Sequence, residues 1–223
     1  MEVKYLYHSG VSVLAGETLL VFDYYKKGID EEAIKKARNV LVFVSHGHRD
    51  HFDKGIFKWR ELNPDIRYIL SSDIVFERHG DIFRMGADEE LRFDGIIVRT
   101  LGSTDEGVAY VVETPDGVVF HSGDLNWWHW EGEPDEYNAG MEERFKAEID
   151  KLSSTRIDTA FIPVDQRLEN ARYYSIDHLM ENSSVERVCP IHFWDDWNFI
   201  RRVSKDLSDR SYYDKIYFYG RQI

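Results

Sequence analysis

Three histidines and an aspartate lie within six residues of the 223-residue chain, as His46, His48, Asp50 and His51. They directly follow Val40–Val44, a continuous apolar run typical of a strand buried on both faces of a sheet. A loop at the carboxyl end of such a strand can point its side chains into one pocket. Imidazole nitrogen suits Zn²⁺, Fe²⁺ and Mn²⁺, and a carboxylate favours a harder ion or a second one. The pattern therefore predicts a metal site, with a solvated histidine-rich loop as the alternative.

Three further segments carry side chains that can serve such a site. Asn126–Trp130 contains three tryptophans in four residues, and Trp127 is expected to line a cleft or to plug the sheet core. Asp165 ends an apolar run and can contact substrate or stand in a surface turn. His121 also ends an apolar run and can orient a neighbouring carboxylate or pack as an ordinary strand residue. The sequence leaves both alternatives open in each case.

The elements that must position these residues alternate along the chain. Asp30 is a candidate N-cap for a helix over Ile29–Arg38, because acidic residues open this segment and basic residues close it. Pro115-Asp116-Gly117 is a turn signal between two strands and predicts a hairpin. The expected strands are Val3–Tyr7, Val11–Leu14, Leu19–Phe22, Val40–Val44, Arg67–Leu70, Ile96–Leu101, Val108–Glu113, Val118–His121, Ile157–Val164, Val185–Ile191 and Lys215–Tyr219. The other expected helices are Glu142–Leu152, Ser175–Asn182 and Trp197–Leu207. This order predicts one layered α/β domain over residues 1–223, with mixed sheets.

Composition excludes several classes of protein. The chain has 28 Lys and Arg against 41 Asp and Glu, and the formal net charge of −13 disfavours binding to a nucleic-acid duplex. No segment approaches the ~20 apolar residues that span a bilayer, and the first ten residues lack the features of a signal peptide. Cys189 is the only cysteine, so no intrachain disulfide can form. We therefore expect a cytoplasmic protein whose partner is a small molecule, without a membrane or nucleic-acid partner.

The order of these motifs resembles that of the metallo-β-lactamase fold superfamily. Besides His46–His51, the segments that carry the resemblance are Leu20-Val21-Phe22-Asp23, Thr100–Thr104, His121-Ser122-Gly123-Asp124 and Pro190-Ile191-His192-Phe193. The resemblance implies a four-layer αβ/βα sandwich with two mixed β-sheets. Tyr7-His8-Ser9-Gly10 is also similar to the start of the branch that includes ascorbate-phosphate lactonase, where this histidine lies close to the site. For His8 the alternative is a structural histidine tied to a turn carbonyl.

The resemblance also implies a role for each ligand position. The implied ligands are His46 and His48 for a first ion, Asp50, His51 and His192 for a second, and Asp124 as the bridge between them. Two ions roughly 4 Å apart can share a hydroxide whose pKa is low enough for attack at neutral pH. Asp50 would orient that hydroxide and is the leading candidate for proton transfer. One or two Zn²⁺ ions are expected, with Mn²⁺ or Fe²⁺ as alternatives.

One position departs from the family pattern. The turn Leu101–Thr104 has Ser103 where the family has its third first-site histidine, and a hydroxyl is a poor Zn²⁺ ligand beside an imidazole. Three outcomes stay open: one ion at the second site, two ions with water filling the gap, or a substitute ligand nearby. His121 and His129 are the first candidates for a substitute.

These patterns predict a metal-dependent hydrolase of a small-molecule ester, lactone, amide or phosphodiester. The first alternative is a nucleic-acid phosphodiesterase, which the acidic charge and the short chain oppose. The second is a degenerate member that binds a metal or a metabolite without catalysis, and Ser103 is its only support. Substrate choice in this superfamily lies in the loops, so neither the substrate nor the oligomeric state follows from the sequence.

Overall fold

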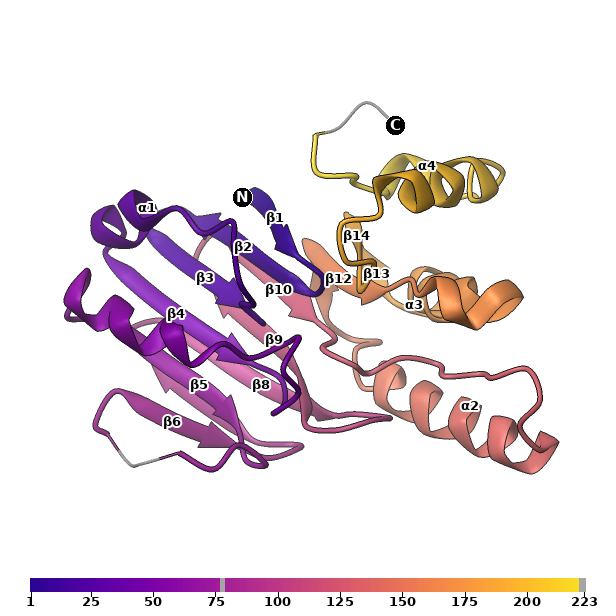
Figure 1. The fold of residues 1–223 in the computed structure, drawn as a ribbon, viewed down its shortest axis with the longest axis horizontal. Helices are drawn as coiled ribbons and strands as arrows, with labels where there is room; N and C mark the ends of the chain where they lie inside the picture. Colours follow the sequence, from indigo (N-terminus) through magenta and orange to yellow (C-terminus); the bar gives the residue numbers. More distant parts are fainter. Residues whose placement is uncertain (77–78, 221–223) are drawn as a thin grey trace.

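The apolar runs of the first third of the chain form one six-stranded mixed sheet in the computed structural model, which describes residues 1–76 and 79–220 (Figure 1). Its strands, in spatial order, are β1 (Glu2–Tyr7), β2 (Gly10–Ala15), β3 (Thr18–Phe22), β4 (Asn39–Val44), β5 (Arg67–Ser71) and β6 (Ile82–Met85). The pairs β1–β2 and β2–β3 are antiparallel, and the three pairs from β3 to β6 are parallel.

A second six-stranded mixed sheet packs against the first. Its spatial order is β14 (Val188–Ile191), β12 (Thr159–Pro163), β10 (Gly117–His121), β9 (Val108–Thr114), β8 (Ile96–Gly102) and β7 (Glu90–Phe93). The strands from β7 to β10 are antiparallel, whereas β10, β12 and β14 are parallel. Two short strands, β11 (Arg156–Ile157) and β13 (Ser184–Val185), pair with each other beside this sheet.

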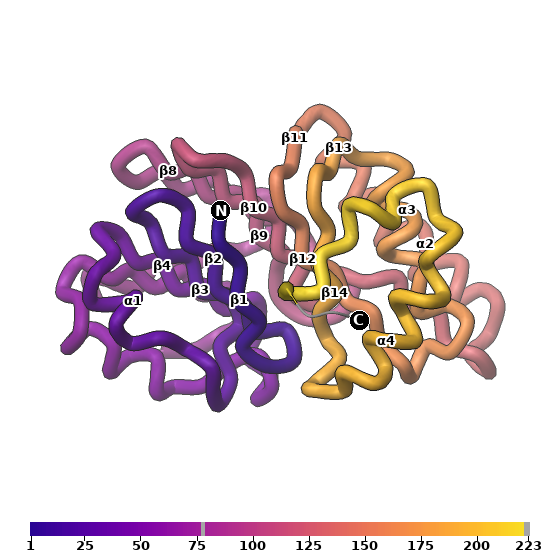
Figure 2. Tube along the Cα trace, turned by 90° about the horizontal axis from the view of Figure 1, so that it is seen from above, coloured from indigo at the N-terminus to yellow at the C-terminus, as the bar shows by residue number. Residues whose placement is uncertain are grey.

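Three apolar clusters hold four layers together. The middle cluster lies between the sheets and includes Phe43 and Phe161. A second cluster buries α1 (Glu31–Lys36) and the 3₁₀ helix η1 (Lys54–Glu61) on the outer face of the first sheet, through Ile34 and Trp59. A third covers the outer face of the second sheet with α2 (Asp135–Asp150), α3 (Tyr174–Asn182) and α4 (Trp197–Asp206). Seen from above, the half that contains β1–β4 and α1 lies beside the half that contains α2–α4 (Figure 2). The expected four-layer sandwich with two mixed sheets is thereby confirmed.

Most expected elements are present, and their local signals act as predicted. The Asp30 carboxylate accepts hydrogen bonds from the backbone N–H groups of Glu32 and Ala33, so it is the N-cap of α1. Gly117 has a φ of 136° at the start of β10, directly after the Pro115-Asp116 turn, and this conformation favours glycine. The helix expected over Glu142–Leu152 begins seven residues earlier, at Asp135.

The expected strand over Lys215–Tyr219 is wrong. Tyr213–Lys215 is instead a 3₁₀ turn, η3, and the segment meets the sheet only through an isolated bridge between Ile216 and Val188. The backbone N–H of Tyr217 donates to the Val188 carbonyl, at 2.8 Å. Pro190 lacks the N–H that the next parallel hydrogen bond would need, so the ladder ends there.

The loops that follow the strands meet at one edge of the sandwich. Phe22 of β3 pairs in register with Phe43 of β4, so the residues after these two strands leave the sheet side by side. β8, β10, β12 and β14 end at the same edge, and the turn between β1 and β2 joins them. In open α/β sheets this is the place where ligands bind. Within the described residues, no helix combines the length and apolarity needed to cross a membrane.

Candidate metal centre

Asp124 lies at the middle of a cluster of imidazoles at this edge. Its Oδ1 is 3.3 Å from His51 Nε2 and 3.5 Å from His192 Nε2, and its Oδ2 is 3.6 Å from His46 Nε2. His48 Nδ1 lies 3.0 Å from His46 Nε2. Asp124 is 5% exposed, so this carboxylate faces the imidazoles and not solvent. Residues from three separate loops thus meet around this one carboxylate.

A second set of groups holds the imidazoles from behind. Asp23 Oδ2 is 2.8 Å from His51 Nδ1, and Asp165 Oδ2 is 2.9 Å from His192 Nδ1. Each carboxylate can accept the Nδ1 proton, which leaves the Nε2 lone pair directed at Asp124. Carboxylate–histidine pairs of this kind fix the tautomer of metal-binding histidines and raise their basicity.

His46 and His48 are held in the same way by other groups. The Ser45 hydroxyl donates to Asp23 Oδ2 at 2.7 Å and lies 2.9 Å from His46 Nδ1, whose proton it can therefore accept. Glu106 Oε2 lies 3.4 Å from His48 Nε2, a looser contact at the exposed rim. All four imidazoles therefore direct one nitrogen toward the cluster and the other toward a partner outside it.

The loop after β3 has a strained backbone that this network compensates. Asp23 has a φ of 43°, a left-handed conformation that is uncommon for residues other than glycine. Its carboxylate accepts hydrogen bonds from the Ser45 N–H and the Ser45 hydroxyl, both at 2.7 Å, besides its contact with His51. Burial opposes its charge, but the contact with His51 is strong enough to hold the pKa of Asp23 well below its usual range.

The charges of the cluster suit a cation. Burial lowers the pKa of His46, and also that of His8, to about 4, so both imidazoles are neutral and able to donate a lone pair at pH 7. Burial also disfavours charge on His51, yet Asp124 and Asp23 raise its pKa to about 9. In the metal-free chain His51 therefore carries a proton beside Asp124. A divalent cation bound here would replace that proton.

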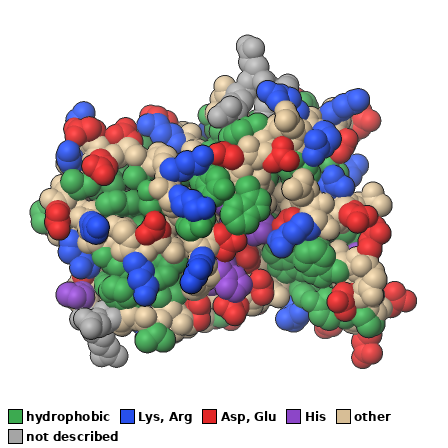
Figure 3. Space-filling model, in the orientation of Figure 1, with side chains coloured by type: hydrophobic (Ala, Val, Ile, Leu, Met, Phe, Trp, Pro, Cys, Tyr) green, Lys and Arg blue, Asp and Glu red, His purple; other side chains and the backbone are tan. Residues whose placement is uncertain are grey.

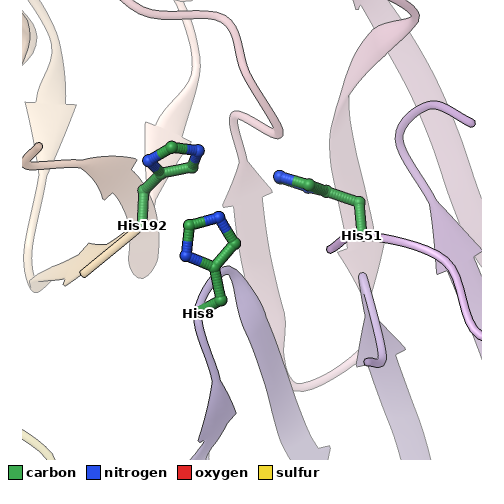
Figure 4. A group of neighbouring side chains, drawn as sticks. All are labelled: His8, His51 and His192. Atoms are coloured by element: carbon green, nitrogen blue, oxygen red, sulfur yellow. The ribbon is translucent and has the colours of Figure 1, made fainter. Parts of the chain in front are cut away.

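The donor atoms fit a metal ion, because several of them have no hydrogen-bond partner among the described residues. His8 Nδ1 and Nε2, His51 Nε2 and Asp124 Oδ1 are buried and make no hydrogen bond within the described residues. Two groups bring donor atoms within 4.8 Å of one another: His8, His51 and His192 in one, and His46, His48 and Asp124 in the other. Figure 4 shows the first group, whose three rings come from separate loops and face a common space. Unpaired buried polar atoms are rare in native proteins and call for an explanation, which a cation provides.

Asp50 and Ser103 differ in how they relate to this cluster. Asp50 Oδ2 lies 3.4 Å from His8 Nε2, and this contact holds the pKa of Asp50 well below its usual range. The Asp50 side chain is 32% exposed and borders the cavity in front of the cluster. Ser103 points elsewhere, because its hydroxyl accepts the N–H of Asp105 at 3.2 Å. Ser103 therefore does not replace the imidazole that the family has at this position.

His121 and His129 do not replace that imidazole either. His121 Nδ1 accepts the Gly123 N–H at 3.1 Å, and its Nε2 donates to the Ser9 carbonyl at 2.9 Å. With both nitrogens occupied, His121 orients the turn that carries Asp124 and has no lone pair for a metal. His129 packs against the ring of Tyr174 and belongs to neither group of donor atoms.

A cavity of about 260 Å³ opens in front of the imidazoles. Its walls include Trp128 and Trp130, whose rings are parallel, with centroids 6.0 Å apart. Arg167 lies over both rings and binds Asp165 through Nε, at 2.9 Å from Oδ2. On the face shown in Figure 3, histidine and acidic side chains gather near the middle, with Lys and Arg close to them. Larger hollows lie away from this edge: two of about 390 and 700 Å³ around Gly16, and one of about 420 Å³ beside β6 and β7.

Trp127 does not line this cavity, contrary to the cleft-lining alternative. Its ring packs between Phe145 of α2 and Tyr174 of α3, and Lys146 lies over its face. Its backbone N–H donates to the Ser175 hydroxyl, which turns the residue toward the helices. Trp128 takes the opposite direction, with its Nε1–H donating to the Asp124 carbonyl at 3.0 Å.

The sequence reasoning missed Glu106, which lies 3.4 Å from His48 Nε2. Its only signal was adjacency, because it lies three residues after Ser103. Trp128 and Trp130 belong to the tryptophan-rich segment that the sequence singled out, and they border the cavity together with Arg167 and Trp194. Asp23 was recognised as part of the motif, but not as the group that holds His51.

An Asp165→Asn variant should weaken metal binding about 10- to 100-fold, the usual effect of losing the group that orients a metal-binding histidine. The amide cannot provide the negative charge that now faces His192 Nδ1 at 2.9 Å. Titration of the metal-free protein with Zn²⁺, followed by calorimetry, measures the effect. Asp177→Asn is the matched control, because Asp177 pairs with Arg210 outside the cluster. Equal affinities in the two variants would contradict the role of Asp165.

Comparison with solved structures places this geometry in a known fold. The chain superposes on the metallo-β-lactamase fold protein YhfI from Bacillus subtilis with a TM-score of 0.58 and 12% identity, over 90% of this chain and 85% of that one. It superposes on CmlA, a diiron β-hydroxylase from Streptomyces venezuelae, with a TM-score of 0.54 and 13% identity, over 96% of this chain and 51% of that one. The chain thus spans about half of CmlA. No protein-family model and no curated protein sequence matches the chain. The chain has the metallo-β-lactamase fold, as its motifs predict.

Proposed function

We propose that this protein is a metal-dependent hydrolase of a small molecule. The observation that carries the proposal is the set of buried donor atoms around Asp124 beside a small cavity, several of which have no hydrogen-bond partner among the described residues. A divalent cation held there would polarise a carbonyl or phosphoryl oxygen and lower the pKa of water. Zn²⁺, Mn²⁺ and Fe²⁺ all suit a donor set of imidazoles and carboxylates.

Asp50 is the residue that we assign to proton transfer. It is the carboxylate of the HxHxDH loop that borders the cavity and remains partly exposed to it. The contact with His8 holds its pKa well below the usual range, so it is ionised at neutral pH. As a weak base it can orient a reacting water and take up its proton transiently. A group at the cavity wall can receive that proton and pass it to the leaving group or to solvent.

The cavity supports a small substrate with a flat or apolar part and an acidic group. Trp128 and Trp130 provide a wall on which such a part can pack. Arg167 is the only cationic side chain among the described residues of the wall, and its pairing with Asp165 leaves Nη1 without a hydrogen bond among those residues. The Arg167 side chain is 59% exposed, so its guanidinium can meet a carboxylate or phosphate. The substrate class follows as an ester, lactone, amide or phosphodiester that carries a negative charge.

The acidic surface supports a small molecule over a nucleic acid. A net charge of −13 repels a polyanion at long range, whereas a single acidic group can still be accepted by one arginine beside a bound cation. The ascorbate-phosphate lactonase-like branch, which the segment around His8 resembles, acts on a substrate of this kind and gives the first compounds to test.

Removal of the metal tests the proposal. Protein treated with a chelator and dialysed should hydrolyse none of a panel of acidic lactones, esters, amides and phosphodiesters, and activity should return when Zn²⁺, Mn²⁺ or Fe²⁺ is added. Tryptophan fluorescence, to which Trp128, Trp130 and Trp194 of the cavity wall contribute, reports whether the protein stays folded after chelation. Activity that survives complete removal of metal, measured by mass spectrometry, would contradict the proposal.

A further inference from the structure

His8 is the histidine of the cluster whose burial is hardest to explain without a ligand. It lies in the turn between β1 and β2, and its side chain is fully buried. Neither ring nitrogen has a hydrogen-bond partner among the described residues, although Nε2 has a looser contact with Asp50 Oδ2, at 3.4 Å. A structural histidine tied to a turn carbonyl would donate one N–H to that carbonyl. Buried polar atoms without a hydrogen bond are rare, so this imidazole indicates an absent partner.

The position of His8 is set by direct contacts with the loop that carries His192. The backbone N–H of His8 donates to the backbone carbonyl of Trp194 at 3.2 Å. The backbone N–H of His192 donates to the backbone carbonyl of His8 at 3.0 Å. The Trp194 ring stacks on the His8 ring, with centroids 3.8 Å apart. Two loops that are distant in sequence are thereby locked to each other at the metal centre.

The backbone is strained at each of these three residues. His8, His192 and Trp194 have φ values of 57°, 67° and 58°, in the left-handed region. Such a conformation is unfavourable for residues other than glycine and persists only where the surrounding structure imposes it. In this backbone conformation the rings of His8 and His192 lie next to each other, with centroids 4.1 Å apart (Figure 4).

The chemistry of the facing nitrogens distinguishes a metal ligand from a packing residue. His8, His51 and His192 place one nitrogen each within 4.8 Å of the others. With no hydrogen bond at either ring nitrogen among the described residues, His8 can present a lone pair to a cation. Bonds of about 2.0–2.1 Å from three imidazoles to one cation bring their nitrogens closer than this, with only a small inward movement.

We propose that His8 is a metal ligand, which together with His51, His192 and Asp124 gives the second site three imidazoles and a carboxylate. The proposal rests on the metal-binding part of the proposed function and not on hydrolysis. The assignment leaves Asp50, which is partly exposed to the cavity and lies 3.4 Å from His8 Nε2, as an ionised carboxylate beside the second site.

The two sites are then unequal. The first has two imidazoles, His46 and His48, and lacks a third because Ser103 is turned toward Asp105. The second has an imidazole more than the family pattern. One metal ion therefore binds tightly at the second site, and any further ion binds weakly at the first.

Metal titration of two His8 variants tests the proposal without an assay of activity. His8→Phe keeps the ring that stacks on Trp194, and His8→Asn keeps a residue that tolerates the left-handed backbone. In wild-type protein stripped of metal, calorimetric titration with Zn²⁺ or Co²⁺ should give one tight equivalent. Both variants should raise the Kd of that equivalent at least about a hundredfold, since they remove a direct ligand. His129→Gln, at a histidine outside the cluster, should leave the Kd unchanged.

Thermal unfolding separates ligand binding from a purely structural role. At a fixed ligand concentration, a ligand that binds the folded state raises the melting temperature more when its Kd is lower, by an amount that follows the logarithm of the ratio of ligand concentration to Kd. Metal should therefore stabilise the wild type strongly and both variants much less. An unchanged tight Kd and an unchanged metal-dependent shift in either folded variant would overturn the proposal for His8 alone. A wild-type protein that binds no metal would contradict the proposed function as well.

Discussion

An Asp124→Ala variant is expected to lose metal binding and hydrolysis together, because Asp124 faces donor atoms of both sites. Its Oδ1 lies beside His51 and His192, and its Oδ2 lies beside His46. Removing the carboxylate therefore takes a ligand from each site at once. A catalytic metal contributes several kcal/mol to stabilisation of the transition state, so kcat/KM should fall about a thousandfold or more. Metal content by mass spectrometry and the rate with the best substrate of the panel measure the two losses.

The matched control is Asp158, which lies between β11 and β12, beside the end of β10 opposite to Asp124. Asp158 accepts the Val118 N–H near the start of β10, far along the strand from Asp124, so Asp158→Ala removes a comparable carboxylate outside the centre. It should keep full metal content. Circular dichroism and cooperative unfolding of the metal-free variants establish that both are folded. A folded Asp124→Ala protein with wild-type metal content would show that the ion binds elsewhere.

The sheets follow from the sequence because their strands are long, apolar and buried. The segment Val40–Val44 has no polar residue and is fully buried in the first sheet, so its pattern is compatible with few structures other than a buried strand. β6 and β7 could not be predicted in this way. Both are four-residue strands at the edges of their sheets, with mixed polar and apolar residues and little burial. Their pairing depends on neighbours that are distant in sequence.

The metal centre shows a similar division between local and distant information. The loop His46–His51 follows a buried strand, and this local arrangement is enough to predict a metal site. The choice between Trp127 and Trp128 as cavity wall is different, because the segment between β10 and α2 has no regular period. There the direction of each ring is decided by distant partners, namely Ser175 for Trp127 and the Asp124 carbonyl for Trp128. His8 likewise depends on a contact with Trp194, which no local pattern reveals.

A Ser103→His variant should raise the metal content from about one equivalent to about two. The turn around Ser103 lies beside the loop that carries His46, because the Val108 N–H donates to the Ser45 carbonyl at 2.9 Å. It also lies beside Asp124, since the Thr104 hydroxyl donates to the Asn126 carbonyl at 2.6 Å. An imidazole at this position would complete the first site with three histidines, the number that holds a catalytic Zn²⁺ in many enzymes.

The design of this experiment separates a new ligand from an added histidine. Ser153→His places an imidazole on an exposed serine after α2 and should leave the content at one equivalent. Combining Ser103→His with His48→Ala should remove the gained equivalent again, because His48 belongs to the first site, together with His46 and Asp124. Two equivalents already present in the wild type would contradict the inequality of the sites. A single equivalent in folded Ser103→His protein would mean that the turn, and not the missing imidazole, keeps a second ion out.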